Sequence, residues 1–184
     1  MNIICNERYK STEEKIQRAL FSLLAFRSYN DIAIKELCYE AGINRSSFYA
    51  HYQDINDLMI KTEQSLSKGI MEIFKPNIEW NAEVFTKLFE FLYKNKNFYK
   101  AYLETNEQTF MEKQDFINYI HIANSSSQYG LDKNKMVYHM AFFAGGLKAI
   151  AKSWLTTGCN ETPEQMARII SEEYDLSWKQ HTLC

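Results

Sequence analysis

The segment Ile32–Leu58 constrains the fold of this chain most strongly, because two short helical patterns in it are separated by a single glycine. The first pattern puts apolar residues on one stripe of a short helix, at Ile34, Leu37, Cys38 and Ala41. Gly42 then allows a sharp turn, since glycine enters the left-handed backbone region without steric cost. Asn44 is a favourable N-cap for a second helix, about Arg45–Tyr52, in which Phe48 faces inward.

Two short helices joined by a glycine turn are typical of a helix-turn-helix, whose second helix fits the major groove of DNA. The second helix is predicted to turn Tyr52 inward with Phe48 and to leave polar side chains pointing outward, at Arg45, Ser46, Ser47, Tyr49 and His51. An arginine fork matches the two acceptors of guanine, and hydroxyls bond bases or phosphates. We therefore predict DNA contacts from Asn44, Arg45, Ser46, Ser47 and Tyr49. The alternative is a helix face that is merely solvated.

This stretch resembles the TetR family of transcriptional regulators, in the run A-G-I-N-R-S-S-F-Y-A-H-Y-Q-D-I-N-D-L from Ala41 to Leu58. Its particular form is similar to the branch that includes dihydroxyacetone-kinase regulators. The resemblance implies that Tyr49 and His51 contact the DNA backbone. Two positions depart from the family pattern: Ile55 replaces a phosphate-binding lysine, and Ala33 replaces a capping threonine.

The composition favours long helices over a barrel or sandwich, because the 184 residues include only two prolines and six glycines. The longest apolar-rich run without acidic or basic residues is too short to cross a bilayer, and the first ten residues lack the pattern of a signal peptide. We therefore expect a cytoplasmic protein. The four cysteines are widely scattered and the four histidines form no ligand pair, so neither a metal site nor a cofactor is expected. No catalytic motif is present, and an enzyme is not expected.

The charge balance is unusual for a DNA-binding segment. Residues 1–60 carry seven basic and eight acidic side chains, which leaves a formal charge of −1. Most DNA-binding domains show a basic footprint. We interpret this balance as local segregation, with cations on the face toward the groove and acids on the other.

Helical patterns continue along the chain. A capping box at Ser11–Glu14 predicts the start of a first helix that ends near residues 27–30. A helix over 55–74, capped by Asp54, ends at Lys75-Pro76-Asn77, because the residue before proline is pushed out of the helical region. Later helices are predicted at Ala82–Lys94, Asn97–Glu104, Phe110–Ala123, Lys133–Thr157 and Pro163–Lys179, with a polar linker over 124–130. The predicted domains are a helix-turn-helix domain at 1–52, a linking helix at 53–75 and a helical regulatory and dimerisation domain at 76–184.

The second domain is rich in aromatic residues, with fifteen Phe, Trp or Tyr between Trp80 and Phe143. Pockets for small effectors are mostly apolar with a few polar groups, and they often lie between helices. We therefore consider a pocket for a small apolar or aromatic effector, lined by Tyr102, Tyr119, His121, Tyr138, His139 and Phe142. The alternative, that these aromatic side chains are ordinary core, stays open.

A patch of small residues interrupts the helix predicted over 133–157. Glycine inside a helix costs roughly 1 kcal/mol relative to alanine, so a close helix–helix approach would explain it. By resemblance to the family, the last two helices would pair with their twins in a homodimer, through Gly145, Gly146, Ala149, Trp154, Met166, Ile169 and Ile170. Packing of the same patch within one chain is the alternative.

Together these patterns predict an all-α protein with an N-terminal three-helix unit and a C-terminal helical bundle. The predicted function is that of a sequence-specific regulator, a ligand-responsive repressor of the TetR type that binds a double-stranded DNA operator as a homodimer. The competing hypothesis is an adaptor or co-activator with the same fold that acts through a partner protein. The missing lysine at Ile55 and the acidic balance favour that alternative slightly.

Overall fold

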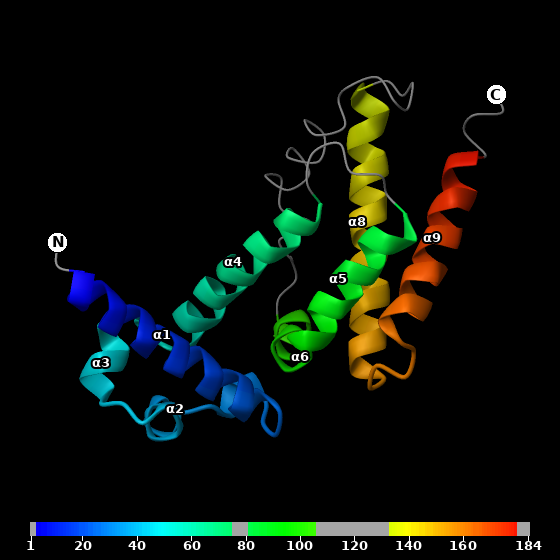
Figure 1. Ribbon diagram of the computed structural model, residues 1–184. Helices are drawn as coiled ribbons and strands as arrows, with labels where there is room; N and C mark the ends of the chain where they lie inside the picture. Colours follow the sequence, from blue (N-terminus) through cyan, green and yellow to red (C-terminus); the bar gives the residue numbers. More distant parts are fainter. Residues whose placement is uncertain (1–2, 75–80, 106–132, 180–184) are drawn as a thin grey trace. The chain divides into compact units, whose positions relative to one another are not determined.

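The computed structural model contains only helices among the regular elements that it describes (Figure 1). The described residues are 3–74, 81–105 and 133–179, with the backbone alone at 3–6, 105, 133–137, 139–140 and 173–179. The all-α prediction is therefore confirmed. The chain divides into two compact units, Met1–Ser65 and Leu66–Cys184.

The first unit is built from α1 (Ile3–Leu24), the 3-10 helix η1 (Tyr29–Asp31), α2 (Ile34–Ala41), α3 (Arg45–Tyr49) and the first part of α4 (Ile55–Ile73). Its core is a set of side chains with little or no exposure, contributed by every α-helix of the unit: Ile16, Leu20, Leu37, Phe48, Tyr52 and Leu58. Leu37 and Phe48 were predicted from the sequence to face inward. Leu23 and Ile43 are only half-buried.

Helix α1 starts well before the predicted capping box at Ser11 and ends at Leu24, before the predicted end. Ser11 lies inside the helix, and the Thr12 hydroxyl donates to the Arg8 carbonyl one turn earlier. The residues before Ser11 include good helix formers and no proline or glycine, so nothing in them prevents the helix from extending toward the N-terminus. The predicted cap was wrong for this reason.

Asp54 caps α4 as predicted. Its carboxylate accepts a hydrogen bond of 2.8 Å from the Asp57 amide, which satisfies one of the free N–H groups at the start of a helix. Leu58, Met59 and Ile70 are buried along this helix, and Phe74, directly after its last residue, is buried too. The predicted break at residues 75–77 lies outside the described residues.

The second unit contains the rest of α4 together with α5 (Ala82–Lys94), α6 (Lys96–Thr105), α8 (Lys133–Thr156) and α9 (Pro163–Lys179). The bounds of α5 and α9 are those predicted from the sequence. Helix α5 packs along α9 and α6 packs against α8 (Figure 1). The helix predicted over 110–123 and the linker over 124–130 lie outside the described residues.

The connection between α8 and α9 combines a left-handed turn with a capping box. Gly158 has a φ of 98° and Cys159 has a φ of 57°, so the chain turns through the left-handed region soon after α8 ends. The Gln165 amide donates to the Thr162 hydroxyl at 3.3 Å, and the Thr162 amide donates to the Gln165 side chain at 2.8 Å. This reciprocal pair fixes the first turn of α9.

Among the described helices, none has the length and apolar character needed to cross a membrane.

Candidate nucleic-acid interface

The turn between α2 and α3 is formed as the sequence predicted. Gly42 ends α2 in the left-handed conformation, with a φ of 63° and a ψ of 39°. The Ile43 amide donates to the Cys38 carbonyl at 3.0 Å, the long bond of a Schellman-type helix end. The backbone therefore fixes the angle at which α3 leaves α2.

Helix α3 is anchored by one buried side chain and exposes polar ones. Phe48 has no exposed surface, whereas Arg45 and Ser46 are exposed, Tyr49 is 56% exposed and Ser47 is half-buried. α-Helical geometry ends at Tyr49, earlier than predicted, and the chain continues as a turn in which the His51 and Tyr52 amides donate to the Phe48 carbonyl. The exposed residues therefore share one short, fixed surface.

Asn44 precedes α3 with the extended backbone of an N-cap residue, but its side chain makes no capping hydrogen bond. The side chain is exposed. Its amide therefore stays available for a partner outside the chain. Ala33 holds the equivalent position before α2, also without a side-chain cap.

The sequence pattern predicted that His51 points outward, but its side chain is buried. Its exposed fraction is only 9%, and its ring stacks on Tyr9 of α1 with 3.8 Å between the ring centroids. Burial lowers the pKa of the imidazole from its ordinary value of 6.5, and Lys61 lowers it further, whereas Glu13 raises it. A contact from this ring to a DNA backbone would require it to leave the stack.

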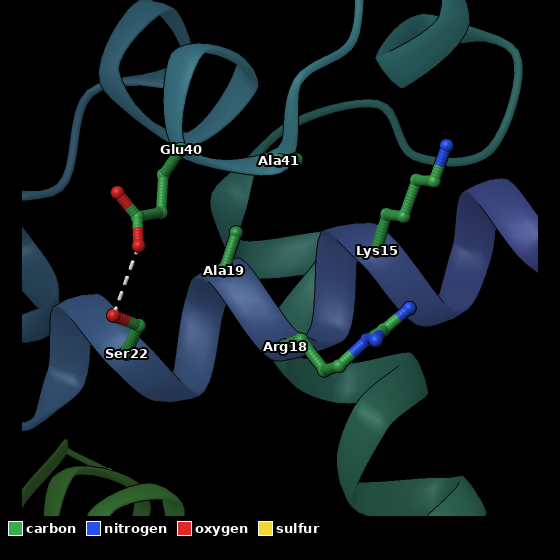
Figure 2. A pocket seen from close by; sticks show the side chains of 6 residues that line it. All are labelled: Lys15, Arg18, Ala19, Ser22, Glu40 and Ala41. Carbon is green, nitrogen blue, oxygen red and sulfur yellow. Dashed lines mark hydrogen bonds between the residues drawn. The ribbon is translucent and has the colours of Figure 1, made fainter.

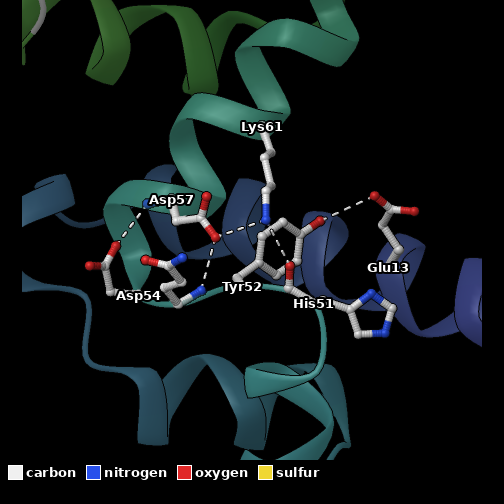
Figure 3. Close-up of polar contacts among 7 residues, drawn as sticks. Glu13, His51, Tyr52, Asp54, Asp57 and Lys61 are labelled. Atoms are coloured by element: carbon white, nitrogen blue, oxygen red, sulfur yellow. Dashed lines mark hydrogen bonds and ion pairs between the residues drawn. The ribbon is translucent and has the colours of Figure 1, made fainter.

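A polar cluster follows α3 and connects it to α1 and α4 (Figure 3). The Lys61 ammonium donates to the His51 carbonyl at 3.1 Å and to the Asp57 carboxylate at 2.9 Å. The same Asp57 oxygen accepts from the Gln53 amide at 2.9 Å, and the Tyr52 hydroxyl donates to Glu13 at 3.4 Å. Hydrogen bonds from Gln53 and Lys61 keep the pKa of Asp57 below its usual range.

The acids of α2 bond to the segment that precedes it. Glu36 pairs with Arg27 at 3.1 Å, and Glu40 accepts a hydrogen bond of 3.0 Å from Ser22. Both acids are thus engaged with α1 or the residues after it. The segregation of cations from acids that we predicted from the near-neutral charge stays a prediction, because Glu36 pairs with a cation here.

A hollow of about 440 Å³ lies between α1 and the end of α2 (Figure 2). Lys15 and Arg18 flank it on α1, with Glu40 and its partner Ser22 at the other end. Because cations and an acid share its rim, the hollow has no single electrostatic preference.

The residues predicted to line an effector pocket lie in different environments in the second unit. Tyr102 is 5% exposed and stacks on Phe98 at 5.5 Å between the ring centroids. Tyr138 and Phe142 of α8 are 76% and 80% exposed. Tyr119, His121 and the side chain of His139 lie outside the described residues.

The residues predicted at a dimer interface divide into two groups. Trp154, Met166 and Ile170 are buried within the single chain, and Trp154 meets Phe89 edge-on at 5.2 Å between the ring centroids. The Trp154 indole also donates to the Glu161 carbonyl at 3.0 Å. The others remain on the surface of α8 and α9, with Gly145 half-buried and Gly146, Ala149 and Ile169 exposed.

Lys61 was not among the predicted site residues. The spacing of Asp57 and Lys61, four apart on one helix, is a sequence signal for an ion pair. The approach of Lys61 to the carbonyl of His51 carries no such signal, because it depends on where the fold places α4 relative to the turn that follows α3.

Comparison with known proteins places these units in a family. The model of a TetR-type "Transcriptional regulator C-terminal region" matches residues 79–173, more than half of the chain. The solved structure of "Dihydroxyacetone kinase operon activator DhaS" is similar with a TM-score of 0.67 and 18% identity, covering 91% of this chain and 96% of that one.

Two further structures share the fold. "Transcriptional regulator FadR from Bacillus subtilis in complex with stearoyl-CoA" gives a TM-score of 0.63 at 14% identity, over 86% of this chain and 95% of that one. A "TetR transcriptional regulator from Streptococcus agalactiae" gives 0.57 at 16%, over 93% and 97%. The helix-turn-helix geometry, the fold and the family match agree: this chain belongs to the TetR family of transcriptional regulators.

Proposed function

We propose that this protein is a sequence-specific DNA-binding regulator that acts as a homodimer and represses transcription until an effector binds. One observation carries the DNA-binding part of the proposal. Asn44, Arg45, Ser46 and Tyr49 are exposed together on the short helix that follows a glycine turn. Such a helix can enter a major groove, where arginine and hydroxyl groups read base edges and phosphates.

The homodimer is supported by the surface of α8 and α9. Phe142, Gly146, Ala149 and Ile169 are exposed. Among the described residues, no atom outside the helix's own nearby backbone lies within 4 Å of a Cβ atom built on Gly145 or Gly146, so the described part of the chain does not require glycine there. A twin helix packed against these positions would explain both the apolar exposure and the glycines. In such a dimer, two recognition helices would meet major grooves about one turn, ~34 Å, apart.

The regulatory part of the proposal rests on linkage. An effector that binds one dimer geometry more tightly than the other shifts the population between them, and so the spacing of the recognition helices. The FadR structure is described with stearoyl-CoA and the DhaS structure as an operon activator. Acyl-CoA thioesters and small aromatic compounds therefore belong in an effector screen. A reporter assay should test for activation as well as repression.

Selection of duplexes from a random library by the purified protein tests the proposal directly. We expect a palindromic duplex to be enriched and to bind about 10³-fold or more tightly than a scrambled duplex at the same salt concentration. A reporter with that duplex at its promoter should be repressed by the protein. Absence of any preferred duplex would contradict the proposal and favour the adaptor hypothesis, which a search for a partner protein would then address.

A thermal-unfolding screen tests for the effector. A ligand at a hundredfold excess over its dissociation constant should stabilise the folded protein by ~2.7 kcal/mol. The same compound should release the selected duplex. A compound that stabilises the protein without changing DNA affinity would contradict its role as an effector.

A further inference from the structure

The end of the recognition helix is held by a side chain from α4. Helix α3 has only five residues, too few for a stable isolated helix, so its direction depends on what holds its two ends. Gly42 determines the first end. At the second end, the Lys61 ammonium donates a hydrogen bond of 3.1 Å to the carbonyl of His51. His51 lies two residues beyond the last residue of α3, so this hydrogen bond fixes the chain where it leaves the helix.

Lys61 is itself held in place by two neighbours (Figure 3). Its ammonium donates to Asp57 at 2.9 Å and lies 5.4 Å from the centroid of the Tyr52 ring. Asp57 also accepts the amide of Gln53. One ammonium and one carboxylate thus engage the three consecutive residues that leave α3, at His51, Tyr52 and Gln53.

The ion pair is partly exposed, with 47% of the Lys61 side chain and 23% of the Asp57 side chain accessible. Exposed pairs of this kind contribute little to the free energy of unfolding. The geometric effect of this pair is different, because the lysine also connects α4 to the turn that follows α3. Loss of this bridge would leave the fold intact while widening the range of orientations open to α3.

We propose that Lys61 is a positioning residue for DNA recognition, which ties the turn that leaves α3 to α4 so that the exposed side chains of α3 meet base edges in one orientation. This inference rests on the proposed DNA-binding function. A direct phosphate contact would predict a different response to salt, because each neutralised phosphate contributes to the salt dependence of binding.

The test compares Lys61→Met, Lys61→Arg and Lys68→Met in the full-length protein. Lys68→Met removes the same charge from an exposed position on the same helix and serves as the matched control. The probes are the duplex selected from the random library and its scrambled version, each at two salt concentrations. Thermal unfolding and amide hydrogen exchange are measured without DNA.

We expect Lys61→Met to reduce the preference for the selected duplex at least tenfold. The slope of log affinity against log salt concentration (the salt slope) should be unchanged, and the unfolding temperature nearly unchanged. The Gln53 amide should exchange faster in this variant, because its acceptor Asp57 loses the ammonium that orients it. Lys61→Arg should retain part of the preference, and Lys68→Met all of it. Asp57→Asn should add little to Lys61→Met, since both act on one cluster.

Three results would overturn the proposal. A salt slope reduced by about one with an unchanged preference would identify Lys61 as a phosphate contact. A fall in affinity that follows the loss of folded protein would show a purely structural role. Unchanged exchange at Gln53 would mean that the bridge does not hold this segment, and this readout needs no DNA. If the wild type selects no duplex, the proposed function itself fails, whatever the exchange data show.

Discussion

Arg45 and Tyr49 are both exposed on α3, yet their chemistry predicts different effects on DNA binding. An arginine that reads a guanine contributes to one base pair, whereas a tyrosine hydroxyl on a phosphate is indifferent to sequence. We expect Arg45→Ala to cost ~1–3 kcal/mol on the selected duplex and to relax the preference at one base pair per half-site. Binding measurements on single-base variants of the duplex check this, and an unchanged preference at every position would contradict it.

Tyr49→Phe should weaken selected and scrambled duplexes by similar factors, because only a hydroxyl is lost. The salt slope should hardly change, since the hydroxyl carries no charge. Titrations of both duplexes at two salt concentrations measure this. A loss confined to the selected duplex would instead indicate that Tyr49 reads a base.

The buried His51 predicts a pH dependence of stability. Its pKa is lowered in the folded state, so the unfolded chain binds the proton more readily. The stabilisation is fully present above the ordinary pKa of 6.5 and is lost as the pH falls from there through the lowered folded value. The loss amounts to about 1.4 kcal/mol for each unit between the two pKa values.

Replacing His51 with Phe should keep a ring against Tyr9 and remove the titration. We therefore expect His51→Phe to lose less stability than the wild type between pH 7.5 and pH 5, measured by urea unfolding at each pH. The carboxylates of the protein are unchanged in this variant, so the difference between the two curves isolates the histidine. Parallel curves would refute the prediction.

The capping hydrogen bonds at the first turn of α9 are expected to contribute to the stability of the protein. Thr162 and Gln165 exchange two hydrogen bonds there, and replacement of a capping threonine by alanine costs roughly 0.5–2 kcal/mol. We expect Thr162→Ala to lower the free energy of unfolding by that amount. Thr156→Ala is the control, because its hydroxyl bonds only to carbonyls of its own helix. Equal losses in chemical denaturation of the two variants would argue against the cap.

Some of the residues predicted at the dimer interface are already buried within the single chain, so the test of assembly must use a position that is exposed there. Gly146→Leu places a large side chain where the described residues of the single chain leave open space, so we expect the monomer to fold at least as well as the wild type. If α8 packs against its twin, the same change should weaken the dimer. Analytical ultracentrifugation over a concentration series measures this, with Glu90→Leu at an exposed position of α5 as the control. A wild type that is monomeric at micromolar concentration would remove the basis for the prediction.

Local patterns in the sequence were sufficient to predict the helices and the turn. The bounds of α5 and α9, the left-handed Gly42 and the buried Phe48 all follow from residues within a few positions of one another. Helical periodicity, glycine geometry and capping act over one or two turns, so they can be recognised in the sequence without knowing the tertiary structure. The same reading placed the start of α1 wrongly, because a capping motif inside a continuous run of helix formers does not stop the helix.

Contacts between distant segments were decided only by the tertiary structure. His51 is buried because Tyr9 of α1 stacks on it, and Trp154 is buried because Phe89 of α5 meets its ring. Lys61 reaches the carbonyl of His51 because the fold brings the first turns of α4 next to the turn that follows α3. Periodicity assigns a residue to a face of its helix. Which neighbour covers that face depends on how the helices pack, and packing is set by many side chains at once.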